Sequence, residues 1–131
     1  MRQMSGTEKQ SRQAWKEIVV RRDGQRDLVF TGRLLAKESS HRDVGDESKR
    51  WDEYTVYETK GGNHVLEHVY HTQRQGERNA YEAWVGVDLA ALLDAAAYTD
   101  PDDAEGKRKI YPSVLKRLAE ACGVQLHETI E

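Results

Sequence analysis

The chain has 131 residues, of which 37% are hydrophobic and 33% are charged, and its formal net charge is -3. This length predicts one domain with a thin core, and the negative charge argues against strong non-specific binding to nucleic acid or anionic membranes. A single cysteine excludes an intramolecular disulfide framework, and no apolar run approaches the ~20 residues that cross a bilayer. We therefore expect a cytoplasmic protein with no membrane partner.

The N-terminal segment, residues 1–13, has no apolar side chain other than methionine, which predicts a flexible arm ahead of one α+β domain spanning residues 14–131. Residues 14–22 are rich in β-branched and aromatic side chains, and Asp23-Gly24 is a typical hairpin turn. The returning strand, residues 27–38, places Leu28, Phe30, Leu34 and Ala36 on one face. Gly32 at its centre predicts a bend or bulge.

Residues 39–49 are rich in Ser, Asp and Gly and predict a surface loop. A second hairpin follows, in which residues 51–59 and 65–70 flank the turn at residues 60–63. With Gly61 and Gly62 as a two-residue turn, Tyr54 lies opposite Val69 and Tyr57 lies opposite Leu66. Both faces of this hairpin are partly apolar, which predicts that one face packs on helices and favours a partner or a second copy on the other.

Residues 80–87 are consistent with either a fifth strand or the start of a helix, because the periodicity does not decide. Asp88 is a typical N-cap for a helix with its apolar residues at helical spacing, and Pro112 opens a second helix that Gly123 ends. The sequence thus predicts a curved antiparallel sheet of four to five strands, built from two hairpins, with two C-terminal helices packed on one face.

No motif in the sequence carries a clear chemistry. The histidines at positions 64, 68 and 71 are predicted on a strand, where a rise of about 3.3 Å per residue separates the first two and points the third to the opposite face. Residues 100–106 depart from the calcium-loop spacing, and Cys122 lies on the apolar stripe of the last helix, which is typical of a core residue. We therefore assign no catalytic residue, metal ligand or cofactor.

Two groups of residues are candidates for contact with a partner. Tyr and Trp are enriched at protein interfaces, so the interface candidates are Trp51, Tyr54, Tyr57, Leu66, Tyr70 and Trp84. Residues 1–50 carry 12 Lys and Arg against 8 Asp and Glu, whereas residues 51–131 carry 8 against 15. The basic half supplies nucleic-acid candidates, namely Arg12, Arg21, Arg22, Arg26 and Arg33.

The order of segments resembles the C-terminal domain of the EXLDI family, bacterial proteins of unassigned function named after a C-terminal motif. The resemblance covers residues 15–131 and lies in EIVVRR, LVFTGRLLAK, DEYTVYETKGG, VDLAALLDA and IYPSVLKRLAEA, while the ending HETIE approximates the motif. Family members carry an upstream segment that resembles a ribbon-helix-helix DNA-binding module, which this sequence does not show. The resemblance therefore implies neither direct sequence-specific DNA binding nor a catalytic residue.

These observations favour a non-enzymatic binding or regulatory module that acts through protein–protein contacts, including self-association. One alternative is a nucleic-acid-associated regulator, or a mobile-element or anti-defence protein, that uses the basic N-terminal half. Another is a small-molecule pocket or an uncharacterised enzyme between sheet and helices, in which a cavity holding His68, Tyr57 or Glu53 would take part.

Overall fold

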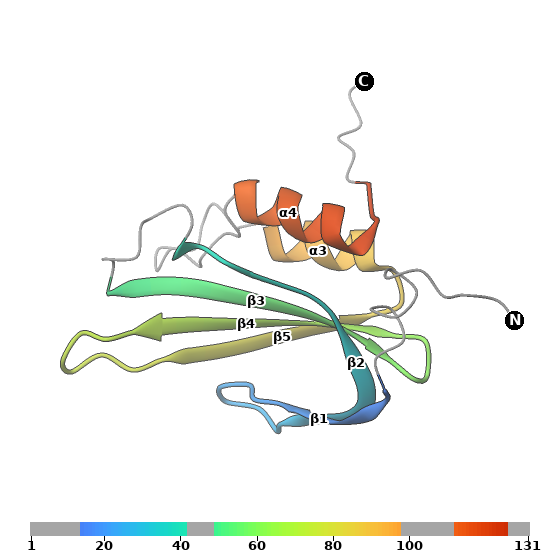
Figure 1. Cartoon of the computed structure of the whole chain (residues 1–131). Helices are drawn as coiled ribbons and strands as arrows, with labels where there is room; N and C mark the ends of the chain where they lie inside the picture. The colour runs from blue at the N-terminus through green and yellow to red at the C-terminus, as the bar shows by residue number, and fades with distance from the viewer. Residues whose placement is uncertain (1–13, 42–48, 98–111, 126–131) are drawn as a thin grey trace, which may run out of the picture.

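A computed structural model describes residues 14–41, 49–97 and 112–125. Within these residues the chain forms a five-stranded antiparallel sheet in the order β1-β2-β3-β4-β5, with two helices packed against it (Figure 1). The elements are β1 (Lys16–Val20), β2 (Leu28–Ser39), β3 (Arg50–Thr59), β4 (His64–Thr72), β5 (Ala80–Gly86), α3 (Leu89–Ala97) and α4 (Pro112–Cys122). This arrangement confirms the predicted α+β class and the two helices on one face of a curved sheet.

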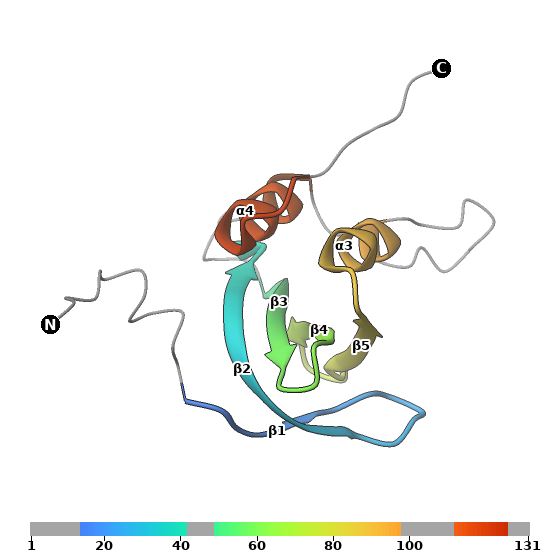
Figure 2. The same ribbon diagram turned by 90° about the vertical axis from the view of Figure 1, so that its right-hand side faces the viewer.

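The sheet is strongly curled, and the bend lies in β2. Figure 2 shows β2 running from the helix layer down past β3 and then turning beneath the sheet, where it pairs with β1. A Cβ atom on Gly32 would lie 2.6 Å from the backbone oxygen of Glu58 and 2.9 Å from the ring of Phe30. Only glycine allows this close approach, and at Gly32 the pairing partner of β2 changes from β1 to β3.

A second irregularity in β2 corrects the predicted face of one residue. The pairing with β3 shifts between Leu34 and Ala36, because an extra residue is inserted into β2 there. Ala36 consequently packs with the helices, whereas Leu28 and Phe30 pack on the opposite side of the sheet. The sequence placed all of these residues on one face, since strict alternation holds only in a strand without a bulge.

The β3–β4 hairpin forms as predicted, but its register differs by one residue. Tyr54 lies opposite His68 and Tyr57 opposite Val65. The turn is longer than two residues: the Thr59 N–H donates to the Asn63 carbonyl, the Gly62 N–H donates to the Thr59 carbonyl, and Gly62 has a φ of 92°. Hairpin register follows loop length, so one extra turn residue shifted every cross-strand pair.

The remaining elements begin and end at the predicted signals. Residues 80–86, which the sequence left open between strand and helix, form β5. The Asp88 side chain accepts a hydrogen bond from the Ala91 N–H at 3.3 Å and so caps α3. Gly123, with a φ of 69°, ends α4, and the Val124 N–H donates to the Ala119 carbonyl beyond it.

Two apolar clusters lie on opposite sides of the sheet. On the helix face, α3 and α4 pack over β2 to β5, with Leu93, Val114 and Leu118 fully buried. On the other side, which we call the inner face, β1 and the start of β2 fold beneath the sheet and bury Ile18, Val20 and Val65. The second semi-apolar face of the hairpin is therefore covered in part by the chain's own strands.

Three sequence predictions lie outside the described residues: the arm at residues 1–13, most of the predicted loop, and the acidic segment at residues 100–106. In the part of the chain that the structure describes, no helix is long and apolar enough to cross a membrane.

Candidate functional site

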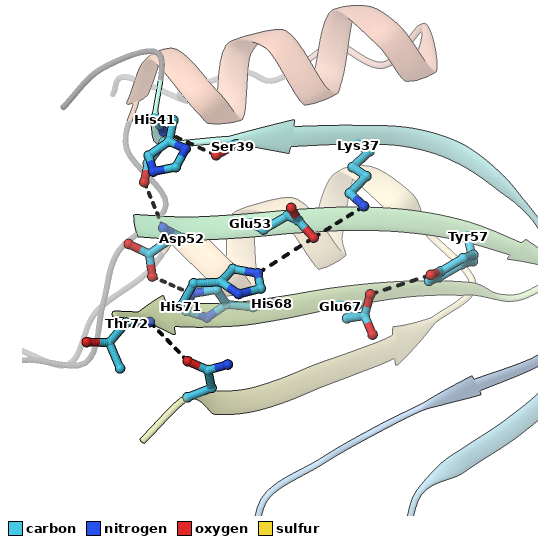
Figure 3. Close-up of polar contacts among 12 residues, drawn as sticks. Lys37, Ser39, His41, Asp52, Glu53, Tyr57, Glu67, His68, His71 and Thr72 are labelled. Atoms are coloured by element: carbon cyan, nitrogen blue, oxygen red, sulfur yellow. Dashed lines mark hydrogen bonds and ion pairs between the residues drawn. The ribbon is translucent and has the colours of Figure 1, made fainter. Parts of the chain in front are cut away.

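The polar end of the inner face brings together charged side chains from three strands. Because Thr55 pairs with Glu67 and Glu53 pairs with Val69, both carboxylates lie on this face (Figure 3). Glu53 Oε1 lies 3.3 Å from Lys37 Nζ and 3.8 Å from His71 Nε2. The sequence named Glu53 only as a residue of a cavity and gave it no partner, because the cross-strand neighbour depends on the register.

Burial and neighbouring negative charge raise the pKa values of Glu67 and Tyr57 on the inner face. Partial burial, together with the nearby Glu53 carboxylate, raises the pKa of Glu67 above its usual value, although hydrogen bonds from Tyr57 and Thr55 oppose the change. Burial and the same carboxylates raise the pKa of Tyr57 to about 12. The Tyr57 hydroxyl therefore stays protonated in the physiological range and acts as a hydrogen-bond donor to Glu67, at 3.5 Å.

An aromatic stack borders the polar end of the sheet. The Trp51 ring lies between the imidazoles of His41, with centroids 4.1 Å apart, and His71, with centroids 5.0 Å apart. Trp51 and His71 face each other across the β3–β4 ladder, which explains their contact. The stack holds these side chains in place beside Glu53 and leaves each of them partly exposed.

In the part of the chain that the structure describes, β5 is an edge strand of the sheet. Tyr81 is bound on this edge by Asp23, whose N–H donates to the Tyr81 carbonyl at 3.0 Å and whose carboxylate accepts from the Tyr81 N–H at 2.9 Å. Backbone groups of a strand alternate in direction, so the N–H and C=O groups of Ala83 and Val85 also point outward. Within the described residues no strand pairs with this edge, and we call these outward groups the β5 edge.

An apolar groove of about 580 Å³ opens beside the β5 edge. It lies between the start of β2, the β3–β4 turn and the end of β5, and its lining residues are Leu28, Val29, Phe30, Thr31, Thr59, Lys60, Gly61, Asn63, Val65 and Val85. Val85 and Val29 are 51% and 62% exposed at its rim. Lys60 is the only charged residue in this lining, so the groove is suited to apolar side chains.

The predicted histidine placement on a strand is confirmed, and the three rings have different partners. The His64 ring contacts the Val87 carbonyl at 2.9 Å, and His71 stacks on Trp51 on the inner face. His68 is buried on the helix face, where its ring nitrogens lie 2.7 Å from Asp52 and 3.1 Å from Glu82. Among residues 14–41, 49–97 and 112–125, no group of three or more His, Cys, Asp and Glu is placed to hold a metal ion.

The interface candidates divide into buried and accessible residues. Tyr54, Leu66 and Tyr70 are buried on the helix face, at 1%, 0% and 8% exposure, so they are core residues of the monomer and not surface available to a partner. They were selected for residue type, but α3 and α4 cover the face on which the observed pairing places them. Trp51 and Tyr57 remain partly exposed on the inner face, and Trp84 is partly buried against the helices.

The described arginine candidates lie in two places, with Arg33 on β2 and Arg21, Arg22 and Arg26 in the connection between β1 and β2. Arg33 is bonded to Glu58 and lies over the Trp15 ring, 4.3 Å from its centroid. Arg22 bonds the Arg26 carbonyl and Gln25 within its own turn, and Arg21 lies over the Tyr81 ring. Arg12 lies outside the described residues.

Cys122 is half-buried against the helix-face cluster, and burial raises the pKa of its thiol to about 11. At neutral pH the thiol is therefore protonated and a poor nucleophile, in agreement with the predicted core role.

The features that the sequence did not reveal are the β5 edge, the groove, the neighbouring carboxylates of Glu53 and Glu67, and the contacts of His68 with Asp52 and Glu82. Each depends on which strands become neighbours, and only the run of apolar residues at positions 83–87 marks the edge in the sequence.

Comparison with models of protein families, with curated proteins and with solved structures gives no match for this chain. The geometry of the site is therefore the basis of the functional proposal.

Proposed function

We propose that this chain is a non-enzymatic protein-binding module that receives an extended segment of a partner protein as an added strand on the β5 edge. The observation that carries the proposal is the outward-pointing backbone of Ala83 and Val85 beside the apolar groove. In strand addition, main-chain hydrogen bonds supply affinity, and pockets for alternate side chains supply specificity.

Among residues 14–41, 49–97 and 112–125, no feature that usually protects a sheet edge covers the β5 edge beyond Tyr81. Natural edges are shielded by charge, proline or bulges, because an open edge pairs readily with another chain. The only charged residue of β5 is Glu82, and its side chain is bonded to His68 on the helix face. Val85 and Val87 are instead 51% and 73% exposed. This part of the surface is therefore well suited to pair with an extended chain.

The surroundings of β5 favour a single extended segment over the edge of a second copy. Figure 2 shows α3 on one side of β5 and the β1–β2 hairpin on the other. The Asp23 contacts to Tyr81 close the start of the edge. If the β5 edge of a second copy paired here, its own α3 and β1–β2 hairpin would have to lie in the space beside α3 and the β1–β2 hairpin of the first copy. A single strand is narrow enough to enter between α3 and the hairpin.

The groove defines the chemistry of the segment. Alternate side chains of an added strand point to one face of the sheet, so every second residue would face Val65, Phe30 and Val85. Apolar, preferably β-branched residues suit these positions, because they pack well beside a strand. Lys60 at the rim favours an acidic residue at the end of the segment that reaches the β3–β4 turn.

A synthetic peptide of alternating threonine and valine, with a glutamate at each end, tests the proposal. We expect its addition to isotope-labelled protein to shift the amide resonances of Ala83 and Val85 and to slow their hydrogen exchange. Val85→Pro removes an outward N–H and should abolish these changes without breaking the β4–β5 ladder, since this N–H does not bond β4. Val85→Thr keeps the N–H and should retain most of the binding.

Val19→Pro is the matched control, because Val19 is also an exposed valine, at 55%, on the edge strand β1. It should leave peptide binding unchanged. Equal binding by wild type and Val85→Pro would contradict strand addition at β5. A concentration-dependent dimer in light scattering that Val85→Pro abolishes would contradict the single segment and identify a second copy as the occupant.

A further inference from the structure

His68 occupies an unusual position for a histidine, because both of its ring nitrogens face carboxylates. Nε2 lies 2.7 Å from Asp52 Oδ1 on β3 (Figure 3). Nδ1 lies 3.1 Å from Glu82 Oε1 on β5. A neutral imidazole can donate through only one nitrogen, whereas the imidazolium donates through both. The geometry thus matches the doubly protonated ring, which joins three adjacent strands by two charge-assisted hydrogen bonds.

The surroundings hold the ring in this position. His68 is 2% exposed, and its imidazole stacks on Tyr54 with a centroid distance of 4.6 Å and an interplanar angle of 9°. Trp84 lies on β5 with its ring 6.4 Å away and also stacked. With the ring fixed between aromatic side chains, the loss of its proton cannot be relieved by rotation into solvent.

Two opposing effects act on the protonation of His68. Burial disfavours the charged ring, but the hydrogen bonds and charges of Asp52 and Glu82 outweigh it, and the net result is a raised pKa. The stabilisation is therefore complete below the ordinary histidine pKa of 6.5 and is lost as the pH rises through the higher value in the folded protein.

Other titratable groups lie on the strands and helices packed around His68, and two of them have named partners of their own. On its own strand, the His64 ring bonds the Val87 carbonyl. On β2, Glu38 is paired with Arg117 of α4. In the described part of the chain, the other titratable groups include Arg50, Tyr54 and Tyr70 on the helix face of the sheet. On the helices they are Asp94, Lys116 and Glu120 at exposed positions and Cys122 against the helix-face cluster.

We propose that Asp52, His68 and Glu82 form a pH-sensitive clamp that fastens β5 to the sheet. When His68 carries both protons, Glu82 is tied through the ring to Asp52, and β5 is held in register. When the ring loses a proton, it can donate to only one of the two carboxylates. Either the buried Asp52 or Glu82, whose side chain is 45% exposed, then loses the hydrogen bond from the ring, and the link between β3 and β5 through His68 is broken. If β5 is the docking strand, as the proposed function holds, the state of the clamp also changes the affinity for the partner segment. This regulatory role rests on the proposed function, whereas the clamp itself does not depend on it.

The ring nitrogen resonances of His68, followed through a pH titration of the protein without peptide, test the clamp directly. We expect two ring N–H protons at pH 6 and a deprotonation midpoint above the usual histidine value. After correction for base catalysis, the hydrogen exchange of the Glu82 and Trp84 amides should become about tenfold faster above that midpoint. A neutral ring at pH 6, or exchange that is independent of the midpoint, would overturn the clamp.

Variants separate the clamp from general effects of pH. Glu82→Gln should lower the His68 midpoint, and His68→Gln should remove the pH dependence of amide exchange in β5. His64→Gln is the matched control on the same strand and should leave both measurements unchanged. If His68→Gln does not fold, the wild-type titration still decides.

Peptide binding separates the clamp from the proposed function. Loss of peptide binding at every pH with an intact clamp would contradict only the proposed function. Equal peptide affinity on both sides of the midpoint would contradict the regulatory role of the clamp.

Discussion

At the scale of single residues, Gly32 lies where β2 changes its pairing partner. The first half of β2 pairs with β1, and the second half pairs with β3. The backbone oxygen of Glu58 occupies the space that a side chain on Gly32 would need. Gly32 does not line the groove, but it allows the close approach of β2 and β3 next to the residues that do.

We expect Gly32→Ala to lower the free energy of unfolding by about 1–3 kcal/mol, because the added methyl group overlaps backbone that cannot move freely. Urea denaturation measures the change. Gly61→Ala is the control, since the nearest atom to its Cβ position is 3.9 Å away, and it should cost much less. Equal costs for the two substitutions would contradict the role of the close approach at Gly32.

At the scale of elements, an ion pair fastens the connection between β4 and β5. Glu77 accepts hydrogen bonds from the Arg50 guanidinium and from the Thr72 hydroxyl, the latter at 2.6 Å. The Arg50 hydrogen bonds are the main cause that lowers the pKa of Glu77 to about 2. The connection therefore keeps its charge pair to low pH, although added salt should weaken a pair at the surface.

Glu77→Gln should reduce the dependence of stability on pH in the acid range. The lowered pKa means that Glu77 stabilises the fold above its ordinary pKa of 4.5, and that this contribution is lost as the pH falls toward 2. Urea midpoints measured between these pH values check the prediction. Glu17→Gln, at an exposed position on β1, should retain the wild-type profile. An unchanged profile in Glu77→Gln would show that the ion pair does not contribute.

The elements also show where sequence patterns were sufficient and where they were not. The existence of both hairpins, the Asp88 cap and the Gly123 stop follow from local preferences of single residues. The register of β3 and β4 and the face of Ala36 were predicted wrongly, because one extra residue in a turn or a bulge changes every later pair. Interface candidates chosen by residue type therefore included three core residues.

At the scale of the whole molecule, the sheet is packed on both sides, by the helices on one face and by the β1–β2 hairpin on the other. Leu93 and Val20 are each 0% exposed, and they belong to different clusters. Because both clusters pack on the same central strands, we expect them to unfold together.

Leu93→Ala should cost about 2–5 kcal/mol and Val20→Ala about 0.5–3 kcal/mol, since each leaves a cavity in its own cluster. In both variants, tryptophan fluorescence and far-ultraviolet circular dichroism should report one coincident urea transition. A separate early transition in Val20→Ala would show that the β1–β2 hairpin unfolds independently of the helix layer. The part of the groove that the start of β2 lines would then unfold with the hairpin.

The sequence by itself determined the α+β class, the two hairpins, the Asp88 cap of α3 and the two ends of α4, because each depends on contacts or backbone preferences within a few residues. Only the tertiary structure decided that residues 80–86 form the edge strand, that the N-terminal hairpin covers the inner face, and that Asp52, His68 and Glu82 meet across three strands. These features arise from the pairing of segments far apart in the chain, where one residue of register exchanges every neighbour.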